Sequence, residues 1–493
     1  MAGRPGAGQW LRIEWPERVR VASVQLFGGA ANAETSVRSG LLRFDDGSTV
    51  LVGGLEPSGG APTTVAFTPR STRSVRFTVT AIAAGSSASV ARFTAYAAGT
   101  TPPQWSPSGT PSFATTAKPA SACAVPARSA ATAGTPALKL LCPSPGFSVG
   151  AAATVVVAGP SGAALSVSAF LPGDDGRGGT VRQIASGTIS GTGRATLRVP
   201  MTKLAHGPTA VRVTAVGAAR PLYVQVVNRS GVAARGSSPA FTKNMTLAYS
   251  DDFASPVTAT RSGAGARYAS AKPVLGGSDE FGEAIFAQPT KDTGNLTTLN
   301  DDWLRIRTAP LAPGKSDPNR WGRTSTGGMI SSAHTGGSGF SAQYGYFEAR
   351  MLAPAGEGTW PAFWMLSESN LVEKVSAVGE VDAVELYGTN PAGSCQSQHN
   401  YGKHTDGSAV RCSGQNGFAD WALAWHTYGV RITPSATVYY IDGTPTTTIK
   451  GLVKRSDPYF FMINLALGGG WPIHLSGTNG VADLYVDSVK VYV

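Results

Sequence analysis

Charged residues make up only 14% of the 493 residues, and glycine (61) and proline (33) are abundant. This composition excludes a coiled coil or a helical repeat array, which need many Glu and Lys residues, and no apolar run reaches the ~18 residues of a membrane helix. The net charge of +11 comes from scattered basic residues, the densest group being Arg70, Arg73 and Arg76, so it predicts a basic surface and neither a nucleic-acid nor a membrane partner.

Two stretches rich in Pro, Ser, Thr or Gly predict linkers, at residues 99–121 and 229–243. They divide the chain into segments 1–98, 122–228 and 244–493, each of a plausible size for a domain. No window holds a helical stripe longer than about two turns. We therefore expect three all-β domains.

The first segment alternates apolar and polar residues. Asp46-Gly47 separates two strand-like runs in LRFDDGSTVLVG, which is typical of a β-hairpin. Val75, Phe77 and Val79 then predict one buried strand face. The second segment has the runs VSAFL, ATLRV and AVRVTAV between glycine-rich turns, as in a small immunoglobulin-like β-sandwich, which we expect to act as a spacer.

Four cysteines fall into two local pairs, Cys123 with Cys142 and Cys395 with Cys412. Each pair closes a loop of fewer than twenty residues, which suits a disulfide within one domain. Disulfides persist in oxidising compartments, so we expect a secreted protein. The start of the chain, MAGRPGAGQW, lacks the apolar core of a signal peptide, so the export signal is expected to be absent from this chain.

The second cysteine pair also allows a zinc site, because His399 and His404 lie between its members and thiolates with imidazoles suit tetrahedral zinc. The irregular spacing of these four residues favours a disulfide instead. So does the presence of the other cysteine pair, Cys123 and Cys142. A nucleophile-elbow pattern at Ser148 is set aside, since a β-branched run follows where the helix of that motif must begin.

The segment GEVDAVELYG carries three carboxylates, Glu380, Asp382 and Glu385, in an otherwise apolar strand-like run. In a regular strand Glu380 and Asp382 share a face and Glu385 points away. A one-residue β-bulge near Ala383-Val384 returns Glu385 to that face. The two glutamates could then serve as nucleophile and acid of a retaining glycosidase, with Asp382 setting their pKa values apart. The alternative is a strand edge protected by inward-pointing charges.

Upstream lies YGYFEARMLAPAGEGTWPAFWML, with Trp360, Phe363 and Trp364 within five residues. Aromatic side chains commonly floor saccharide sites because sugars present apolar C–H faces. The motifs YGYFEARM, GTWPAFWML, GEVDAVELYG, WHTYGVRI, VYYIDG, FMINLALGGGWP and YVDSVKVYV follow in order and cover almost all of residues 244–493. In these motifs the segment resembles glycoside hydrolase family 16, the β-jelly-roll endoglycanases that include laminarinases, lichenases and agarases.

The resemblance implies both a fold and catalytic roles. The fold is all-β, with a C-terminal β-jelly-roll sandwich and its concave substrate cleft preceded by two smaller β-sandwich domains. Glu380 matches the nucleophile of the family, Asp382 the assisting carboxylate and Glu385 the general acid/base. The five-residue step between the glutamates is the bulged variant, which is typical of laminarinase-like members.

The resemblance also implies binding residues. Trp360 and Trp364 match aromatics beside the cleaved bond, and Trp471, in GGGWP, matches another cleft-side aromatic. A histidine on the strand after the carboxylates is expected to contact substrate, either His399 or the second histidine of CQSQHNYGKH. Asp487 matches a carboxylate that helps hold a structural calcium in many relatives, and no cofactor is expected for catalysis.

Residues 1–98 resemble a discoidin-type (coagulation-factor type C) carbohydrate-binding domain, through GQWLRIEWPERVRVASVQLFG, LRFDDGSTVLVGGL and SVRFTVTAIAAG. The opening strands of that family are absent, as if the chain begins inside the domain.

These patterns together predict a secreted, monomeric, retaining endo-β-glycanase that acts on a polysaccharide. β-1,3-Glucan is the leading substrate because of the bulged motif, with mixed-linkage glucan and β-galactan (agar-type) as alternatives. A transglycosylase would share the glycosyl-enzyme intermediate, and a non-catalytic glycan-binding protein would share the fold.

Overall fold

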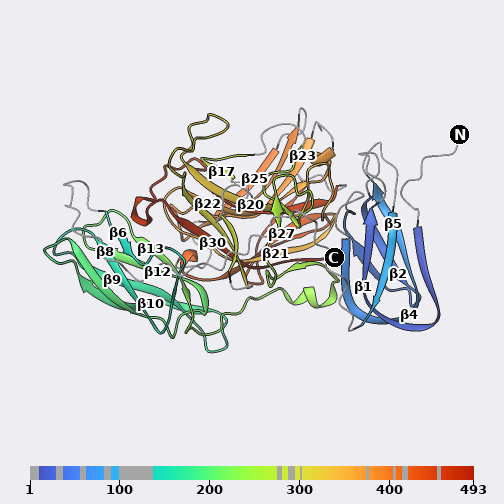
Figure 1. Cartoon of the computed structure of the whole chain (residues 1–493), viewed down its shortest axis with the longest axis horizontal. Coiled ribbons are helices and arrows are strands. Elements are labelled where there is room, and N and C mark those ends of the chain that lie inside the picture. The colour runs from blue at the N-terminus through green and yellow to red at the C-terminus, as the bar shows by residue number, and fades with distance from the viewer. Residues whose placement is uncertain are drawn as a thin grey trace.

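The computed structural model contains three β-rich units, and the C-terminal unit lies between the other two (Figure 1). It describes residues 10–28, 37–55, 63–82, 90–98, 137–274, 280–286, 295–299, 302–372, 377–402, 407–413, 420–451 and 457–493. Within these ranges no helix is long and apolar enough to cross a membrane. Short helical turns are η1 (Ala240–Asn244), α1 (Ser369–Val372), η2 (Trp421–Leu423) and η3 (Ser476–Thr478).

The N-terminal unit is a five-stranded antiparallel sheet in the order β3-β2-β4-β1-β5. Its expected hairpin is confirmed, since Gly47 takes a left-handed turn (φ 82°) between β2 and β3. Among the described residues we find this one sheet and not the two of a sandwich. Its strands are β1 (Trp10–Gly28), β2 (Val37–Phe44), β3 (Thr49–Val52), β4 (Thr63–Ile82) and β5 (Val90–Ala97).

The long strands of this sheet bend at register shifts in the β1–β4 pairing. The bend lets one face enclose its own core, in which Val75, Phe77 and Val79 are buried as their alternation predicts.

The middle unit is a β-sandwich of a five-stranded sheet, β10-β9-β12-β13-β7, and a three-stranded sheet, β11-β8-β6. Apolar residues from the inner faces of the two sheets fill one core. The strands are β6 (Lys139–Cys142), β7 (Phe147–Val149), β8 (Ala152–Ala158), β9 (Ala164–Pro172), β10 (Gly179–Thr188), β11 (Arg194–Pro200), β12 (Gly207–Ala215) and β13 (Leu222–Asn228).

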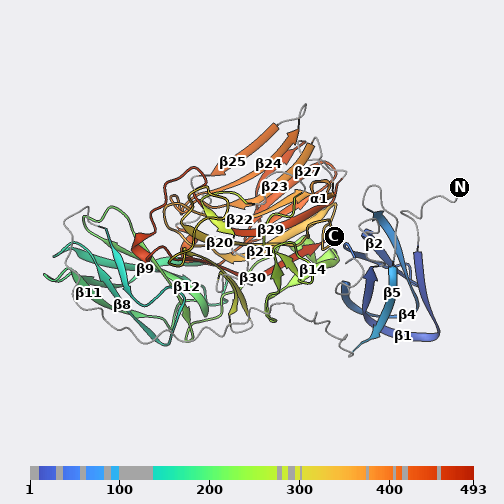
Figure 2. The same cartoon turned by 45° about the horizontal axis from the view of Figure 1, so that its top comes forward.

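The C-terminal unit is a jelly roll of two large sheets (Figure 2). The carboxylate sheet, named for the trio it bears, contains β15 (Ala259–Thr260), β16 (Tyr268–Ala269), β20 (Ser325–Ser331), β29 (Tyr459–Leu467), β22 (Thr359–Ser367), β23 (Ala377–Glu385), β24 (Ser394–Gly402) and β25 (Gly407–Ser413), with β17 (Ala284–Phe286) beside β20. The opposite sheet contains β14 (Leu247–Asp251), β18 (Leu296–Leu299), β19 (Trp303–Pro310), β21 (Gly345–Leu352), β26 (His426–Ile432), β27 (Ala436–Ile441), β28 (Thr444–Lys450) and β30 (Ala482–Tyr492).

The main core of the jelly roll lies between these two sheets. Central strand β29 is buried at every position, because its outer face is covered as well. Phe281 and Phe286 pack there against Trp364, Phe460 and other apolar side chains.

The middle sandwich, which we expected to act as a spacer, is docked on the jelly roll through buried polar contacts. Asp420 accepts hydrogen bonds from Arg212 Nη1 (2.9 Å) and Tyr223 Oη (2.7 Å) of the sandwich. Gln225 exchanges two hydrogen bonds with the backbone of Asp483. These buried hydrogen bonds fix the position of the middle sandwich on the jelly roll.

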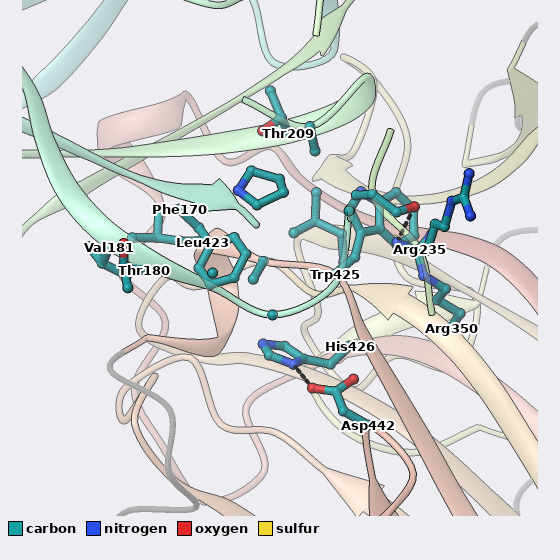
Figure 3. A pocket seen from close by; sticks show the side chains of 18 of the residues that line it. Phe170, Thr180, Val181, Thr209, Arg235, Arg350, Leu423, Trp425, His426 and Asp442 are labelled. Carbon is teal, nitrogen blue, oxygen red and sulfur yellow. Dashed lines mark hydrogen bonds and ion pairs between the residues drawn. The ribbon is translucent and has the colours of Figure 1, made fainter. Parts of the chain in front are cut away.

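A cavity of about 610 Å³ remains between these units (Figure 3). Phe170 and Val181 of the sandwich face Trp425 and His426 of the jelly roll across it. Its jelly-roll wall comes from the opposite sheet and adjoining loops, so the cavity does not open onto the carboxylate trio.

Candidate active site

The three carboxylates lie on β23, which pairs with β22 on one side and β24 on the other. Glu380 pairs with Leu366 and Asp382 with Trp364, while Glu385 pairs with Ala362. These partners are alternate residues of one strand and therefore share a face. The register skips one residue between Asp382 and Glu385, so the one-residue bulge occurs where the sequence predicts it and brings the trio together.

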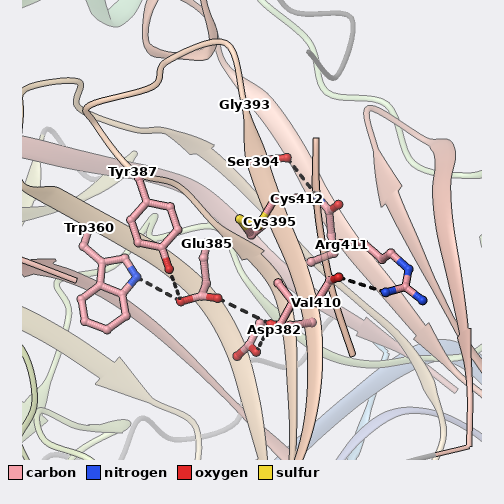
Figure 4. Close-up of a disulfide and its surroundings, with 12 residues drawn as sticks. Trp360, Asp382, Glu385, Tyr387, Gly393, Ser394, Cys395, Val410, Arg411 and Cys412 are labelled. Carbon is pink, nitrogen blue, oxygen red and sulfur yellow. Dashed lines mark hydrogen bonds between the residues drawn. A yellow bond between two sulfur atoms is a disulfide. The ribbon is translucent and has the colours of Figure 1, made fainter. Parts of the chain in front are cut away.

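A shared hydrogen-bond donor connects two of the three carboxylates, Asp382 and Glu385. Ser397 Oγ, on β24, lies 2.5 Å from Asp382 Oδ2 and 3.5 Å from Glu385 Oε2. Glu385 Oε1 accepts hydrogen bonds from Trp360 Nε1 and Tyr387 Oη, each at 3.1 Å (Figure 4). The two aromatic donors therefore bind Oε1 of Glu385, while its Oε2 faces Ser397.

His399 lies opposite Glu380 in the β23–β24 register. Its Nε2 is 3.3 Å from Asp382 Oδ2 and 4.0 Å from Glu380 Oε1, and its Nδ1 is 2.7 Å from Ser408 Oγ. Glu380 Oε1 also accepts a hydrogen bond from Tyr401 Oη (3.0 Å). The expected histidine therefore contacts the carboxylates themselves, whereas His404 lies outside the described residues.

Burial and mutual repulsion raise the pKa values of the glutamates. Burial, then the charge of Asp382, raise the pKa of Glu380 to about 8. The same two causes raise the pKa of Glu385. The hydrogen bond to Asp382 raises the pKa of His399. Three carboxylates this close disfavour full ionisation of the site, and the raised pKa of His399 favours a cationic imidazole beside them.

The predicted tryptophans take three different positions. Trp360 is half-buried, stacks on Tyr387 with ring centroids 6.1 Å apart, and bonds Glu385. Trp364 lies beside Asp382 on β22 but is only 8% exposed, because Phe281 covers it, and its Nε1 bonds an asparagine of β29. Trp471 is 47% exposed in the loop after β29.

Sequence reasoning missed Ser397, Tyr387 and Tyr401 as partners of the trio. Burial, then the negative charges of neighbouring carboxylates, raise the pKa values of the two tyrosine hydroxyls, so both remain hydrogen-bond donors. Tyr387 follows Glu385 by two residues, a signal within the motif itself. Ser397 and Tyr401 follow the period of two that places His399 on the same face, and this period could have identified them.

Cys395 and Cys412 form a disulfide between β24 and β25, as expected (Figure 4). The oxidised sulfurs exclude the alternative in which these cysteines ligate zinc. In the other expected pair, Cys142 is buried in β6, and Cys123 lies outside the described residues.

Asp487, which we expected to help hold calcium, is paired with an arginine. Its carboxylate is 3.2 Å from Arg350 Nη1, in a bulge of the β21–β30 pairing. Calcium takes six to eight oxygen ligands, and an adjacent guanidinium disfavours a divalent cation. In the described part of the chain, the grouping that could hold a metal is instead Glu380, Asp382 and His399, with ligand atoms within 4.8 Å of one another.

Residues 288–480 match the family model described as glycosyl hydrolases family 16. The matched region contains the whole trio and its hydrogen-bond partners. Residues 288–480 form a family 16 glycosyl hydrolase domain. Residues 2–95 match a domain of unknown function, DUF7402, and the expected discoidin likeness of that segment is not confirmed.

Two curated relatives each match less than half of this chain. The endo-1,3-1,4-β-glycanase EglC of Rhizobium meliloti (strain 1021) is 32% identical over 209 residues, which is 42% of this chain and 41% of EglC. The β-glucanase of Rhodothermus marinus is 30% identical over 167 residues, 30% of this chain and 57% of that enzyme. The chain thus spans less than two thirds of the length of either relative.

The solved laminarinase catalytic domain from Thermotoga maritima MSB8 is 25% identical to this chain. The match covers 41% of this chain and 81% of that one, with a TM-score of 0.35.

Proposed function

We propose that this protein is a secreted, retaining endo-β-glycanase that hydrolyses β-1,3-glucan. The observation that carries the proposal is the bulged strand β23, which sets Glu380, Asp382 and Glu385 on one face with raised pKa values for both glutamates. Retaining glycosidases need two carboxyl groups flanking one bond, one ionised and one protonated. The disulfide between β24 and β25 supports an oxidising compartment.

Glu385 acts first as the acid. Its Oε1 accepts two hydrogen bonds, so the proton is carried on Oε2 and passes to the glycosidic oxygen as the C–O bond breaks. Glu380 attacks the anomeric carbon from the other side and forms a glycosyl ester. The ionised Glu385 then takes a proton from water, whose oxygen displaces Glu380, and the sugar leaves with its original configuration.

His399 and Tyr401 favour the ionised form of the nucleophile. The positive charge of His399 and the hydrogen bond from Tyr401 both lower the pKa of Glu380, against the burial and the Asp382 charge that raise it. Asp382 in turn holds His399 in its charged form through their hydrogen bond.

The substrate class follows the curated relatives, of which EglC is named an endo-1,3-1,4-β-glycanase and the Rhodothermus marinus enzyme a β-glucanase. The test is release of oligosaccharides from laminarin, lichenan, agarose and β-1,3-galactan. We expect products from laminarin that are absent with Glu380→Gln. Products from agarose or β-1,3-galactan alone would replace the glucan proposal, and equal inactivity of both proteins together with retention on a polymer would favour a glycan-binding protein.

Replacing His399 with glutamine should move the acid limb of the pH–rate profile to higher pH. Activity falls as pH drops through the pKa of Glu380, and loss of the imidazolium raises that pKa, so inactivation begins at a higher pH. An opposite charge this close is worth roughly one pH unit. The measurement is kcat/KM on laminarin from pH 4 to 10. His474→Gln, a half-exposed histidine paired with Glu357, is the control. An acid limb that stays in place contradicts this role.

A further inference from the structure

The structure contains an aromatic platform beyond the trio that the mechanism does not use. Trp321, in the loop before β20, is 53% exposed. The guanidinium of Arg323 lies over its ring, 4.5 Å from the centroid. With one face of the indole covered by Arg323, about half of the side chain remains open to solvent, as a surface for another flat apolar group.

The loop that presents Trp321 is fixed by a buried ion cluster. Asp317 accepts hydrogen bonds from the backbone N–H groups of Asn319, Trp321 and Arg323 at 3.0–3.2 Å, and from the Arg323 guanidinium at 2.8 and 2.9 Å. Arg323 Nη1 also lies 2.6 Å from Glu280 Oε2. Asp317, Arg323 and Glu280 are each at most 8% exposed. An indole held this firmly loses little entropy when it binds a ligand.

Strand order places the loop that bears Trp321 at the same end of the carboxylate sheet as Glu385. At the end of the carboxylate sheet where Glu385 lies, the neighbouring strands are β23, β22, β29 and β20. Trp321 precedes the first residue of β20, and Trp360 stands on β22 between that strand and Glu385. Three strand spacings of ~4.8 Å separate β23 from β20, or about 15 Å, a span that a few sugar residues cover.

Direct contacts connect the two aromatic positions. Glu280, which holds Arg323, is followed by Phe281, whose ring lies 5.6 Å from that of Trp360. Glu283 N then donates to Leu467 O at the end of β29. Segment 280–283 therefore runs from the tryptophan at the trio to the loop of Trp321.

We propose that Trp321 is an outer glycan-binding subsite, which stacks on a sugar ring of a long β-glucan chain several units from the cleaved bond. This inference rests on the proposed function. Because the contact is made only by chains that reach it, Trp321 selects for long substrates and leaves the cleavage of short ones unchanged.

The test is kcat/KM on laminari-oligosaccharides of two to eight glucose units. Trp321→Ala should lower kcat/KM about tenfold on the longest substrates, mainly through KM, and leave the shortest cleaved substrate unaffected. Trp321→Phe, which keeps an aromatic face, should restore most of the loss. Trp10→Ala is the matched control, because Trp10 is equally exposed (53%) and lies under Arg76 in the N-terminal unit.

Two results overturn the subsite while the proposed function stands. One is a wild-type length dependence that Trp321→Ala does not alter, and the other is an equal loss with Trp10→Ala. A wild-type enzyme that cleaves no member of the series would instead contradict the proposed function itself. Melting temperatures of all variants separate a lost contact from lost folding.

Discussion

Glu380→Gln and Glu385→Gln should lose activity in different ways. On laminarin, Glu380→Gln is expected to fall on the order of 10⁶-fold, the scale on which loss of a covalent nucleophile acts in a hydrolase. Glu385→Gln should fall up to about 10⁴-fold, the range of general acid–base catalysis. The reason is that Glu380 forms the bond to the sugar, while Glu385 only transfers protons.

An aryl β-glucoside oligomer with a good leaving group distinguishes the two roles. A nitrophenolate departs without a proton, so Glu385→Gln should form the glycosyl-enzyme at near the wild-type rate and stall at its hydrolysis, giving a burst of nitrophenol. Glu380→Gln should give no burst. Glu17→Gln, an exposed glutamate of the N-terminal unit, serves as the control. A burst with Glu380→Gln and none with Glu385→Gln would exchange the two assignments.

The positions of the three carboxylates could be predicted because two local rules apply to the same ten residues, GEVDAVELYG. The period of two along a strand placed Glu380 and Asp382 together, and the requirement for a second glutamate on that face demanded a bulge, which the register confirms. Neither rule identifies Tyr401 as the donor to Glu380. That contact depends on how β24 aligns with β23, and this register is set by pairing along the whole strand.

Residues distant in sequence make contacts that the local motifs do not predict. Asp487 matches a calcium ligand by motif, yet β21 brings Arg350 against it across the sheet. Trp364 was expected in the cleft, and Phe281, more than 80 positions earlier, covers it. Likewise, nothing local in the middle segment indicates that Tyr223 and Gln225 bond residues of the jelly roll. Such contacts are properties of the assembled fold.

Asp483→Ala should cause a large loss of stability in this chain. Arg307 Nε and Nη2 each lie 2.6 Å from an Asp483 carboxylate oxygen, and Asp483 is fully buried. Removing the carboxylate leaves a mostly buried guanidinium without its partner, which costs about 3 kcal/mol. A fall in the melting temperature of roughly 5 °C is the expected result. Asp174→Ala, at an exposed turn of the middle sandwich, is the matched control and should change little.

The same change should loosen, without abolishing, the contact between the middle sandwich and the jelly roll, because the Asp483 backbone keeps its bonds to Gln225. Arg307 Nη2 also donates to Pro145 O of the sandwich (2.8 Å), and the Asp483 backbone exchanges two hydrogen bonds with Gln225. By scanning calorimetry, the wild type should therefore melt in a sharper transition than Asp483→Ala, in which Arg307 is no longer held in place beside Pro145. The double variant Arg307→Met/Asp483→Leu, which removes both charges, should be more stable than the single variant. A single variant as stable as the wild type would contradict the argument.

The pH dependence of this loss has a definite sign. Burial opposes ionisation of Asp483, but the charge and hydrogen bonds of Arg307 outweigh it and hold the pKa of Asp483 below its usual range. A carboxyl group with a depressed folded-state pKa contributes stability above its unfolded-state value, near 3.9, and loses that contribution as pH falls through the folded-state value. The gap in melting temperature between wild type and Asp483→Ala should therefore be full at pH 7 and shrink as the pH falls below 4. A gap independent of pH would mean that packing, and not charge, accounts for the stability that the Asp483 side chain contributes.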